Sequence, residues 1–114
     1  MSHPLAPDWL IKPADVNALD QKIWPAHARR DQAGQISIGG VSSSHLVEQF
    51  GSPLYVLDLD DVVERARSVE AVLSSALAVS GRTLRIHYAT KALLAADVVR
   101  TLDGLGWGFD VSSF

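Results

Sequence analysis

The run Arg85-Ile86-His87-Tyr88-Ala89-Thr90-Lys91-Ala92 decides how this chain folds. Successive side chains of a β-strand point to opposite faces, so Lys91 shares a face with Ala89 and His87. The opposite face carries the bulkier side chains and one threonine: Leu84, Ile86, Tyr88 and Thr90. The pattern predicts a strand whose apolar face lies under a helix and whose carboxyl end carries a lysine. A flat ligand commonly binds at that end of a parallel strand.

This lysine differs from the other two lysines in the sequence. Lys12 precedes a proline and Lys22 lies in a charged segment, and both fit the solvated surface charge that most lysines are. Lys91 is followed by the apolar run 92–96, which we expect to begin a buried helix. Burial would desolvate the ammonium group and lower its pKa, which favours the neutral amine that forms imines. A solvated surface lysine is the alternative.

Strands and helices are predicted to alternate on both sides of this run. Leu54–Leu57 is a short apolar run typical of a parallel strand covered on both faces. The Asp-x-x-Glu pattern of Asp61 and Glu64 resembles a capping box and predicts a helix that ends near Ser80-Gly81. A second helix is predicted over residues 94–105, and a third strand follows its glycines. Strand, helix, strand, helix, strand is the order of a parallel α/β fold.

The first third of the chain is predicted to be irregular, because four prolines occur in its first 25 residues. Asp15–Trp24 has helical spacing of its aliphatic residues and is predicted to hold one short helix. Gln35–Ile38 alternates and runs into two glycines, which predicts a short strand and a turn. A further short helix, capped by Ser43 or Ser44, is predicted to end at Gly51.

Composition argues against several classes of function. The 114 residues include no cysteine, carry a net charge of −3 and are 47% hydrophobic, as expected of a cytoplasmic domain. The ten Lys and Arg residues are scattered, unlike the basic stripe of a nucleic-acid binder. No apolar run approaches the roughly 18 residues of a membrane helix. The histidines have no metal-ligand spacing, and no metal is predicted. We expect one group of charged helix residues to form a solvated face: Glu64, Arg65, Arg67 and Glu70.

Three segments together resemble one enzyme family. Tyr88–Ala92 resembles the pyridoxal-phosphate lysine motif of the fold type III decarboxylases that act on diaminopimelate, ornithine and arginine. Phe50–Asp58 is similar to the start of the first barrel strand in that family, and Gly106–Ser113 is similar to the strand after the lysine. The three segments occur in the order of the family, which makes the resemblance more specific than one short motif.

The resemblance implies an architecture. Residues 43–114 are expected to form the first three strands of a (β/α)8 barrel of the alanine-racemase-like kind. Residues 1–42 are expected to be an extension that packs on a carboxy-terminal β-domain. Because such a barrel needs about 250 residues, we expect the sequence to be an amino-terminal fragment of a larger enzyme, inactive alone. Its unpaired strand edge and uncovered apolar face should favour aggregation.

The resemblance also implies a site. Lys91 is expected to be the catalytic residue that holds pyridoxal 5′-phosphate, with Ala89 and Asp110 near the cofactor. A turn or N-cap role for Asp110 is the alternative. His87 shares the face of Lys91 but lies deeper, and it is a weaker candidate. The histidine that stacks on the cofactor ring in the family would come after residue 114.

The expected reaction converts meso-diaminopimelate into L-lysine and carbon dioxide in a homodimer, without nucleic-acid or membrane partners. This substrate is expected because segments around Trp9, Asn17 and Trp24 resemble the extension of actinobacterial diaminopimelate decarboxylases. Decarboxylation of ornithine or arginine is an alternative. A non-catalytic pyridoxal-phosphate homeostasis protein is another, although the strand at Ile36–Ile38 argues against its lone barrel. An alanine racemase is disfavoured, because Leu93–Ala96 stands where that family has a Tyr-Gly-His-Gly-like run.

Overall fold

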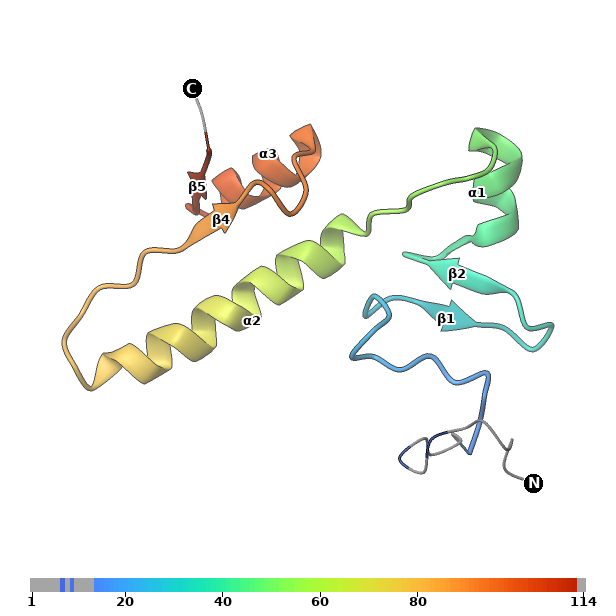
Figure 1. Cartoon of the computed structure of the whole chain (residues 1–114), viewed down its shortest axis with the longest axis horizontal. Helices are drawn as coiled ribbons and strands as arrows, with labels where there is room; N and C mark the ends of the chain where they lie inside the picture. The colour runs from blue at the N-terminus through green and yellow to red at the C-terminus, as the bar shows by residue number, and fades with distance from the viewer. Residues whose placement is uncertain (1–6, 8, 10–13, 113–114) are drawn as a thin grey trace.

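A computed structural model describes residues 7, 9 and 14–112 of the chain (Figure 1). The described residues form a small α/β structure of two sheets and three helices: β1 (Arg29–Arg30), β2 (Ile36–Ile38), β3 (Val41–Ser42), α1 (Ser43–Phe50), α2 (Leu59–Ala78), β4 (His87–Ala89), α3 (Ala96–Gly104) and β5 (Gly108–Asp110). The antiparallel strands β1–β2–β3 lie with α1 at one side of the structure. The parallel pair β4–β5 lies with α3 at the other, and α2 connects the two parts.

The parallel α/β pattern predicted around the lysine is confirmed by the β4–α3–β5 unit. The two strands pair in parallel with Tyr88 opposite Phe109 and Ala89 opposite Asp110. Tyr88 and Phe109 both pack on the core, so the apolar side of the sheet faces the helices as predicted. The other side of β4 carries the exposed His87. Because Ala89 and Asp110 are the last residues of β4 and β5 and pair with one another, both strands end at the same edge of the sheet.

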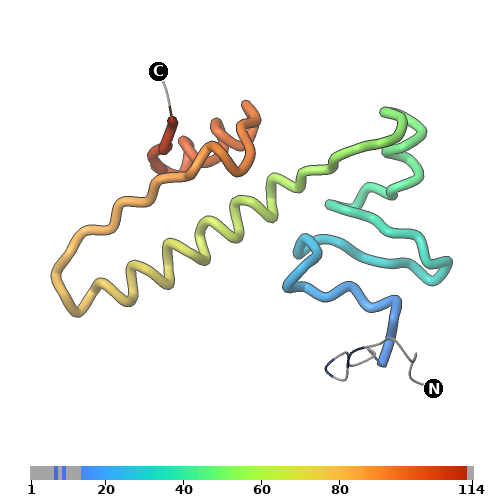
Figure 2. Tube along the Cα trace, viewed as in Figure 1, coloured from blue at the N-terminus to red at the C-terminus, as the bar shows by residue number. Residues whose placement is uncertain are grey.

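The core that supports this unit is small. Its buried residues come from two helices, with Ala66 on α2 and Val98 and Leu102 on α3. Partly buried apolar residues pack around them: Val62, Tyr88, Ala95, Leu105, Trp107 and Phe109. The chain turns back after α2, and residues 82–86 run alongside this helix before they enter β4 (Figure 2). The position of β4 thus depends on the contact between α2 and α3.

The start of α2 differs from the prediction by one turn. Asp58 is the N-cap, and its carboxylate accepts a hydrogen bond of 3.1 Å from the backbone N–H of Asp61. Asp61 is therefore in the first turn of the helix and does not precede it. The predicted end is close to the observed one, because α2 ends at Ala78 and Gly81 has a φ of 63°.

The short elements near residue 40 agree well with the prediction. β2 covers Ile36–Ile38, and the glycines at 39 and 40 both have positive φ in the turn to β3. Ser42 caps α1 by accepting a 3.3 Å hydrogen bond from the N–H of His45, one residue before the predicted caps. Gly51, with a φ of 85°, ends the helix as predicted.

The helix predicted over Asp15–Trp24 is wrong, because this segment forms turns. The carboxylate of Asp15 accepts a 2.8 Å hydrogen bond from the N–H of Asn17, and Asp20 does the same for Lys22 at 2.9 Å. An aspartate that binds the N–H two residues ahead favours a turn over a helix. The spacing of the aliphatic residues indicated a helix that the two aspartates prevent.

The strand predicted at Leu54–Leu57 is also wrong for this chain. The segment is extended but belongs to neither sheet, and Tyr55 is fully exposed. A strand is stabilised by hydrogen bonds to a neighbour, and none of the described residues pairs with this run. The apolar side chains of this segment are therefore not covered on both faces, as the prediction required.

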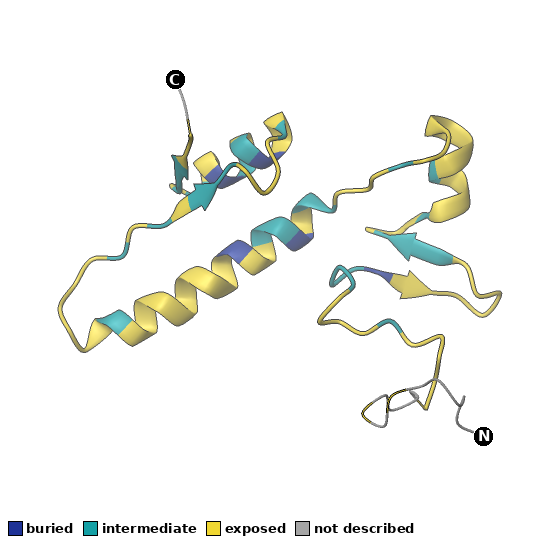
Figure 3. Cartoon of the chain, viewed as in Figure 1, coloured by how far each residue is buried: buried dark blue, intermediate teal, exposed yellow. Residues whose placement is uncertain are grey.

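Much more surface is exposed than in a compact protein of this size. The accessible surface is 9528 Å², compared with about 6,100 Å² expected for a compact monomer of this mass. The radius of gyration is 19.0 Å, compared with about 13 Å for a compact domain of this length. Only the first half of the apolar stripe of α2 is covered, and Val69 and Leu73 are exposed (Figure 3). These surfaces need further protein to cover them.

The 114 residues expressed alone are expected to unfold without a sharp transition and to self-associate. The few buried side chains among the described residues cannot offset the conformational entropy of ordering this part of the chain. Thermal unfolding monitored by circular dichroism, together with binding of an apolar dye, tests this. A stable monomer with one cooperative transition would contradict the expectation.

Candidate active site

The three residues predicted for the site line one pocket of about 440 Å³ at the carboxyl ends of β4 and β5. Ala89 and Asp110 are the last residues of their strands and lie opposite one another in register. Lys91 follows β4 by two residues, in a turn. The rest of the lining consists of Thr90, Leu94 and Ser112. Alternation along the strand predicted that Ala89 and Lys91 share a face, and the family resemblance implied that Asp110 lies near them.

The turn that carries Lys91 is held by hydrogen bonds on both sides. Before the lysine, the N–H and the hydroxyl of Thr90 both donate to the carbonyl oxygen of Asp110, at 3.2 and 2.9 Å. After it, the N–H of Ala92 donates to the carbonyl of Ala89 at 3.1 Å, and the hydroxyl of Tyr88 donates to the carbonyl of Leu93 at 3.1 Å. The sequence assigned Tyr88 and Thr90 only to the apolar face, and it gave no sign of these bonds.

The expected burial of Lys91 is not found. Lys91 is exposed, Leu94 is 72% exposed, and residues 92–95 form a loop. The helix begins at Ala96, and its first buried side chain is Val98. The apolar run after the lysine is therefore mostly outside the helix, and no part of the described chain covers the ammonium group.

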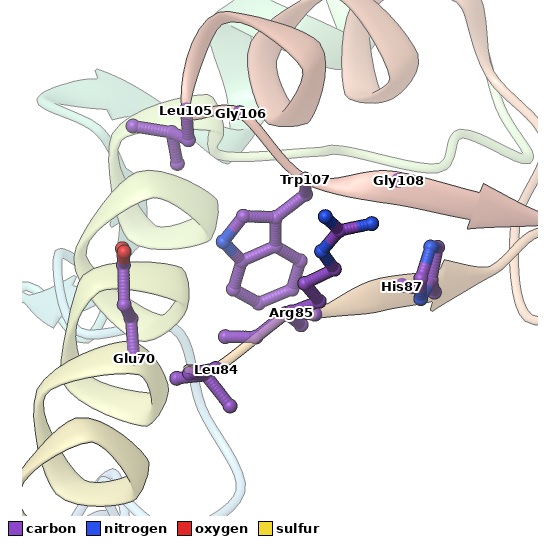
Figure 4. Close-up of a pocket in the computed structure, with 9 residues that line it drawn as sticks. Glu70, Leu84, Arg85, His87, Leu105, Gly106, Trp107 and Gly108 are labelled. Carbon is purple, nitrogen blue, oxygen red and sulfur yellow. The ribbon is translucent and has the colours of Figure 1, made fainter. Parts of the chain in front are cut away.

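His87 lies at the other end of the sheet, away from Lys91. It lines a second pocket, of about 380 Å³, at the amino ends of the two strands together with Glu70, Arg85 and Trp107 (Figure 4). Its ring lies over Gly108, where a Cβ atom would overlap Cδ2 of the ring, so a larger residue at this position would force the histidine ring to move. His87 is absent from the lining of the Lys91 pocket, which agrees with its weak candidacy.

The chain was compared with known proteins, and several are similar to it in sequence. No protein-family profile matches the chain. Diaminopimelate decarboxylase of Corynebacterium efficiens is 35% identical over 97 residues, which are 85% of this chain and 20% of the relative. The same enzyme of Mycobacterium leprae is 32% identical over 111 residues, or 97% of this chain and 22% of the relative. That of Synechocystis is 34% identical over 113 residues, or 99% of this chain and 24% of the relative.

The chain is similar to diaminopimelate decarboxylases. The match extends over most of the chain, which spans about a fifth of the length of these relatives. The resemblance inferred from the lysine motif is thereby confirmed. The two longest of these matches cover 111 and 113 of the 114 residues, so the likeness is not limited to the strands around Lys91.

The described residues add two observations that bear on function. None of their helices is both long and apolar enough to cross a membrane. Within the same part of the chain, no group of three histidine or acidic side chains is placed to bind a metal ion.

The segment before β1 contacts the start of α2 through charged side chains. His27 Nδ1 lies 3.0 Å from Asp58 Oδ2, and its Nε2 lies 3.4 Å from a carboxylate oxygen of Glu64. Asp61 accepts a 3.0 Å hydrogen bond from the N–H of Ala26 and a 2.8 Å bond from Arg65 Nε. The predicted solvated face is confirmed, because Glu64, Arg65, Arg67 and Glu70 are all exposed. Glu64 and Arg65 also contact this segment from the edge of that face.

These contacts shift two pKa values in opposite directions. The hydrogen bond and charge of Asp58, together with the charge of Glu64, raise the pKa of His27 above its ordinary value of 6.5. Burial acts to raise the pKa of Asp61, but the hydrogen bonds from Ala26 and Arg65 outweigh it and hold this pKa below 3.8. Protonated His27 and ionised Asp61 are thus the forms that the contact favours.

We expect the contact at His27 to loosen as pH rises. A raised pKa in the folded state means that His27 contributes its full stability below pH 6.5 and loses it as pH passes the higher folded value. The Ala26 amide should therefore exchange with solvent faster, relative to its intrinsic rate, between about pH 6 and pH 8.

Hydrogen exchange of the Ala26 amide across this range measures the effect. A His27→Asn variant retains a donor but no titrating group, so it should show no pH-dependent change beyond the intrinsic one. Equal pH dependence in both proteins would contradict the assignment to His27. The ionised form of Asp61 adds stability that is lost only as pH falls through its lowered pKa.

Proposed function

We propose that this chain supplies the lysine-bearing part of a pyridoxal-phosphate-dependent decarboxylase that converts meso-diaminopimelate into L-lysine and carbon dioxide. One observation carries the proposal: Lys91 lies in one pocket with Ala89 and Asp110 at the ends of two parallel strands. The likeness to diaminopimelate decarboxylases supports the choice of substrate. Ornithine and arginine are the competing substrates.

The proposed architecture is the beginning of a (β/α)8 barrel over residues 43–114, preceded by an extension over residues 1–42. The parallel β4–α3–β5 unit supports the barrel, and the uncovered stripe of α2 supports the presence of further protein around it. A homodimer in the cytoplasm remains part of this proposal. The cytoplasmic location rests on the cysteine-free composition.

The residues of the pocket fit pyridoxal 5′-phosphate. Its volume of about 440 Å³ is within the range of small-molecule sites, roughly 300 to 1,000 Å³. It combines an amine, a small apolar floor at Ala89, a carboxylate at Asp110 and a hydroxyl at Ser112. When bound, the cofactor supplies an aldehyde that reacts with amines and a ring that withdraws electrons from the bond to be broken.

The residues of this chain would divide the work as follows. Lys91 would hold the cofactor through its Nζ atom, and the same atom can carry a proton to the carbon that has lost its carboxylate. The methyl group of Ala89 leaves room for a flat ring close to the strand. The carboxylate of Asp110 can accept a hydrogen bond from the cofactor or the substrate. Exposed Lys91 needs further protein to exclude water from the reaction.

The non-catalytic alternative keeps some support from the structure. The strand at Ile36–Ile38 was expected to join a second domain, but β2 pairs on both edges within the chain, with β1 and β3. Its presence therefore no longer argues against a lone barrel. A homeostasis protein would bind the cofactor at Lys91 without releasing carbon dioxide.

The release of carbon dioxide by the purified full-length protein, loaded with pyridoxal 5′-phosphate, decides between these functions. We expect release from meso-diaminopimelate that is faster than from ornithine or arginine. Release of carbon dioxide from ornithine or arginine alone would contradict the proposed substrate. Cofactor binding without release from any of the three would favour the homeostasis protein.

A further inference from the structure

We propose that Thr90 and Tyr88 are positioning residues that hold the Lys91 turn in place for capture of the cofactor. The inference rests on the proposed function of Lys91. It concerns two side chains that do not react themselves but fix the backbone from which the reactive amine extends. Hydrogen bonds from both residues hold this exposed turn.

Thr90 anchors the first half of the turn to β5. Its N–H and its hydroxyl converge on the same carbonyl oxygen, that of Asp110, at 3.2 and 2.9 Å. The N–H continues the ladder of the two strands by one step, and the hydroxyl adds a second bond that a valine in this place could not make. Asp110 also lines the pocket with Lys91, so this anchor couples the positions of the two residues.

Tyr88 anchors the second half of the turn to the core. Its ring packs against the cluster of Ala66, Val98 and Leu102, while its hydroxyl donates to the carbonyl of Leu93 at 3.1 Å. Leu93 itself is 46% exposed and does not belong to the core cluster. The ring is thus fixed by the core, and its hydroxyl reaches across the turn to hold the chain after Lys91.

The two anchors compensate for the exposure of the site. The side chain of Lys91 is long, exposed and free to adopt many rotamers, which costs entropy when it binds. A backbone held before and after the lysine limits the positions that the amine explores and keeps it near Ala89 and Asp110. Without the anchors, we expect a wider distribution of amine positions and weaker capture of the cofactor.

The test uses single-group substitutions in the full-length protein. Thr90→Val keeps the shape and removes the hydroxyl, Thr90→Ser keeps the hydroxyl, and Tyr88→Phe removes only the phenolic oxygen. Thr83→Val is the matched control, because Thr83 is exposed in the loop before β4. The measurements are the affinity for pyridoxal 5′-phosphate, followed by visible absorbance, and the exchange rate of the Ala92 amide.

The expected result for Thr90→Val and Tyr88→Phe is a loss of cofactor affinity of about 2- to 10-fold, as for one lost hydrogen bond. Exchange at Ala92 should become faster by a similar factor. Thr90→Ser and Thr83→Val should remain within about twofold of the wild type. The rescue by serine separates positioning from general packing, because serine lacks the methyl group but retains the bond.

Two outcomes would overturn the inference. One is faster exchange at Ala92 in Thr90→Val with unchanged cofactor affinity, which would make the bonds structural only. The other is unchanged exchange in both Thr90→Val and Tyr88→Phe, which would mean that neither bond holds the turn. Failure of the proposed function would give a different result. The wild-type protein would then bind no cofactor, while the exchange rate of the Ala92 amide would still report on the turn.

Discussion

Replacement of Lys91 by alanine is expected to abolish the uptake of pyridoxal 5′-phosphate and the release of carbon dioxide by the full-length protein. Among the described residues that line the pocket at the ends of β4 and β5, Lys91 is the only one with an amine. Alanine removes both the group that holds the cofactor and the group proposed to return a proton. We expect activity to fall by at least about 100-fold, the lower end of what a positioned acid or base contributes. Visible absorbance and the rate of carbon dioxide release measure the two losses.

Two control variants make this result specific. Lys91→Arg retains the positive charge but not an amine that can react with an aldehyde, so it should behave like alanine. Lys22→Ala removes an exposed lysine from a turn outside the pocket and should leave both measurements unchanged. Full cofactor uptake and turnover by Lys91→Ala would contradict the assignment. An effect of Lys22→Ala as large as that of Lys91→Ala would show that loss of any lysine perturbs the protein.

The position of the site was predictable because it depends on local rules. Alternation along a strand fixes which residues share a face, and parallel strands end at one edge of a sheet. These rules placed Ala89 and Lys91 on one face at a strand end, and the family resemblance added Asp110, which lines the same pocket in the structure. These rules could not predict how exposed Lys91 is, because its exposure depends on where the loop ends and α3 begins. α3 begins at Ala96, and the residue before it, Ala95, has no side chain that can cap the helix. The sequence therefore contains no capping residue that marks the start of α3.

The contacts of the first third of the chain were not predictable, because they join residues far apart in the sequence. His27 and Asp58 are separated by 31 positions, and Ala26 and Asp61 by 35. A histidine or an aspartate in isolation gives no indication of such a partner. The acidic start of α2 predicts a local cap, whereas Asp61 also accepts a hydrogen bond from the distant backbone N–H of Ala26. In the sequence, a capping pattern and a tertiary contact look the same.

The strand predicted at Leu54–Leu57 failed for a related reason. Apolar composition indicates that a segment needs cover on both faces, but it does not supply the neighbouring strand. Helices form their hydrogen bonds within themselves, and α2 is formed although much of its apolar stripe is exposed. Strands need a partner, so the predicted strands that formed are those that found one within the described chain.

Replacement of Leu102 by alanine is expected to destabilise the part of the protein that carries the site. Leu102 is 2% exposed, and it lies with Ala66 and Val98 in the small core under β4 and β5. Truncation of a buried leucine costs about 2 to 5 kcal/mol, a large share of the roughly 5 to 15 kcal/mol by which proteins are stable. Because Tyr88 packs on this core, its bond to the Lys91 turn should weaken as well.

Urea unfolding of the full-length protein measures this effect, and Val79→Ala is the control. Val79 is 96% exposed and lies outside the Lys91 pocket, and truncation there should change stability by less than about 0.5 kcal/mol. Equal shifts of the two unfolding midpoints would contradict the core assigned to α2 and α3. We expect a large shift for Leu102→Ala alone, together with weaker cofactor binding. Both effects are expected because Tyr88, which holds the Lys91 turn, packs on this core.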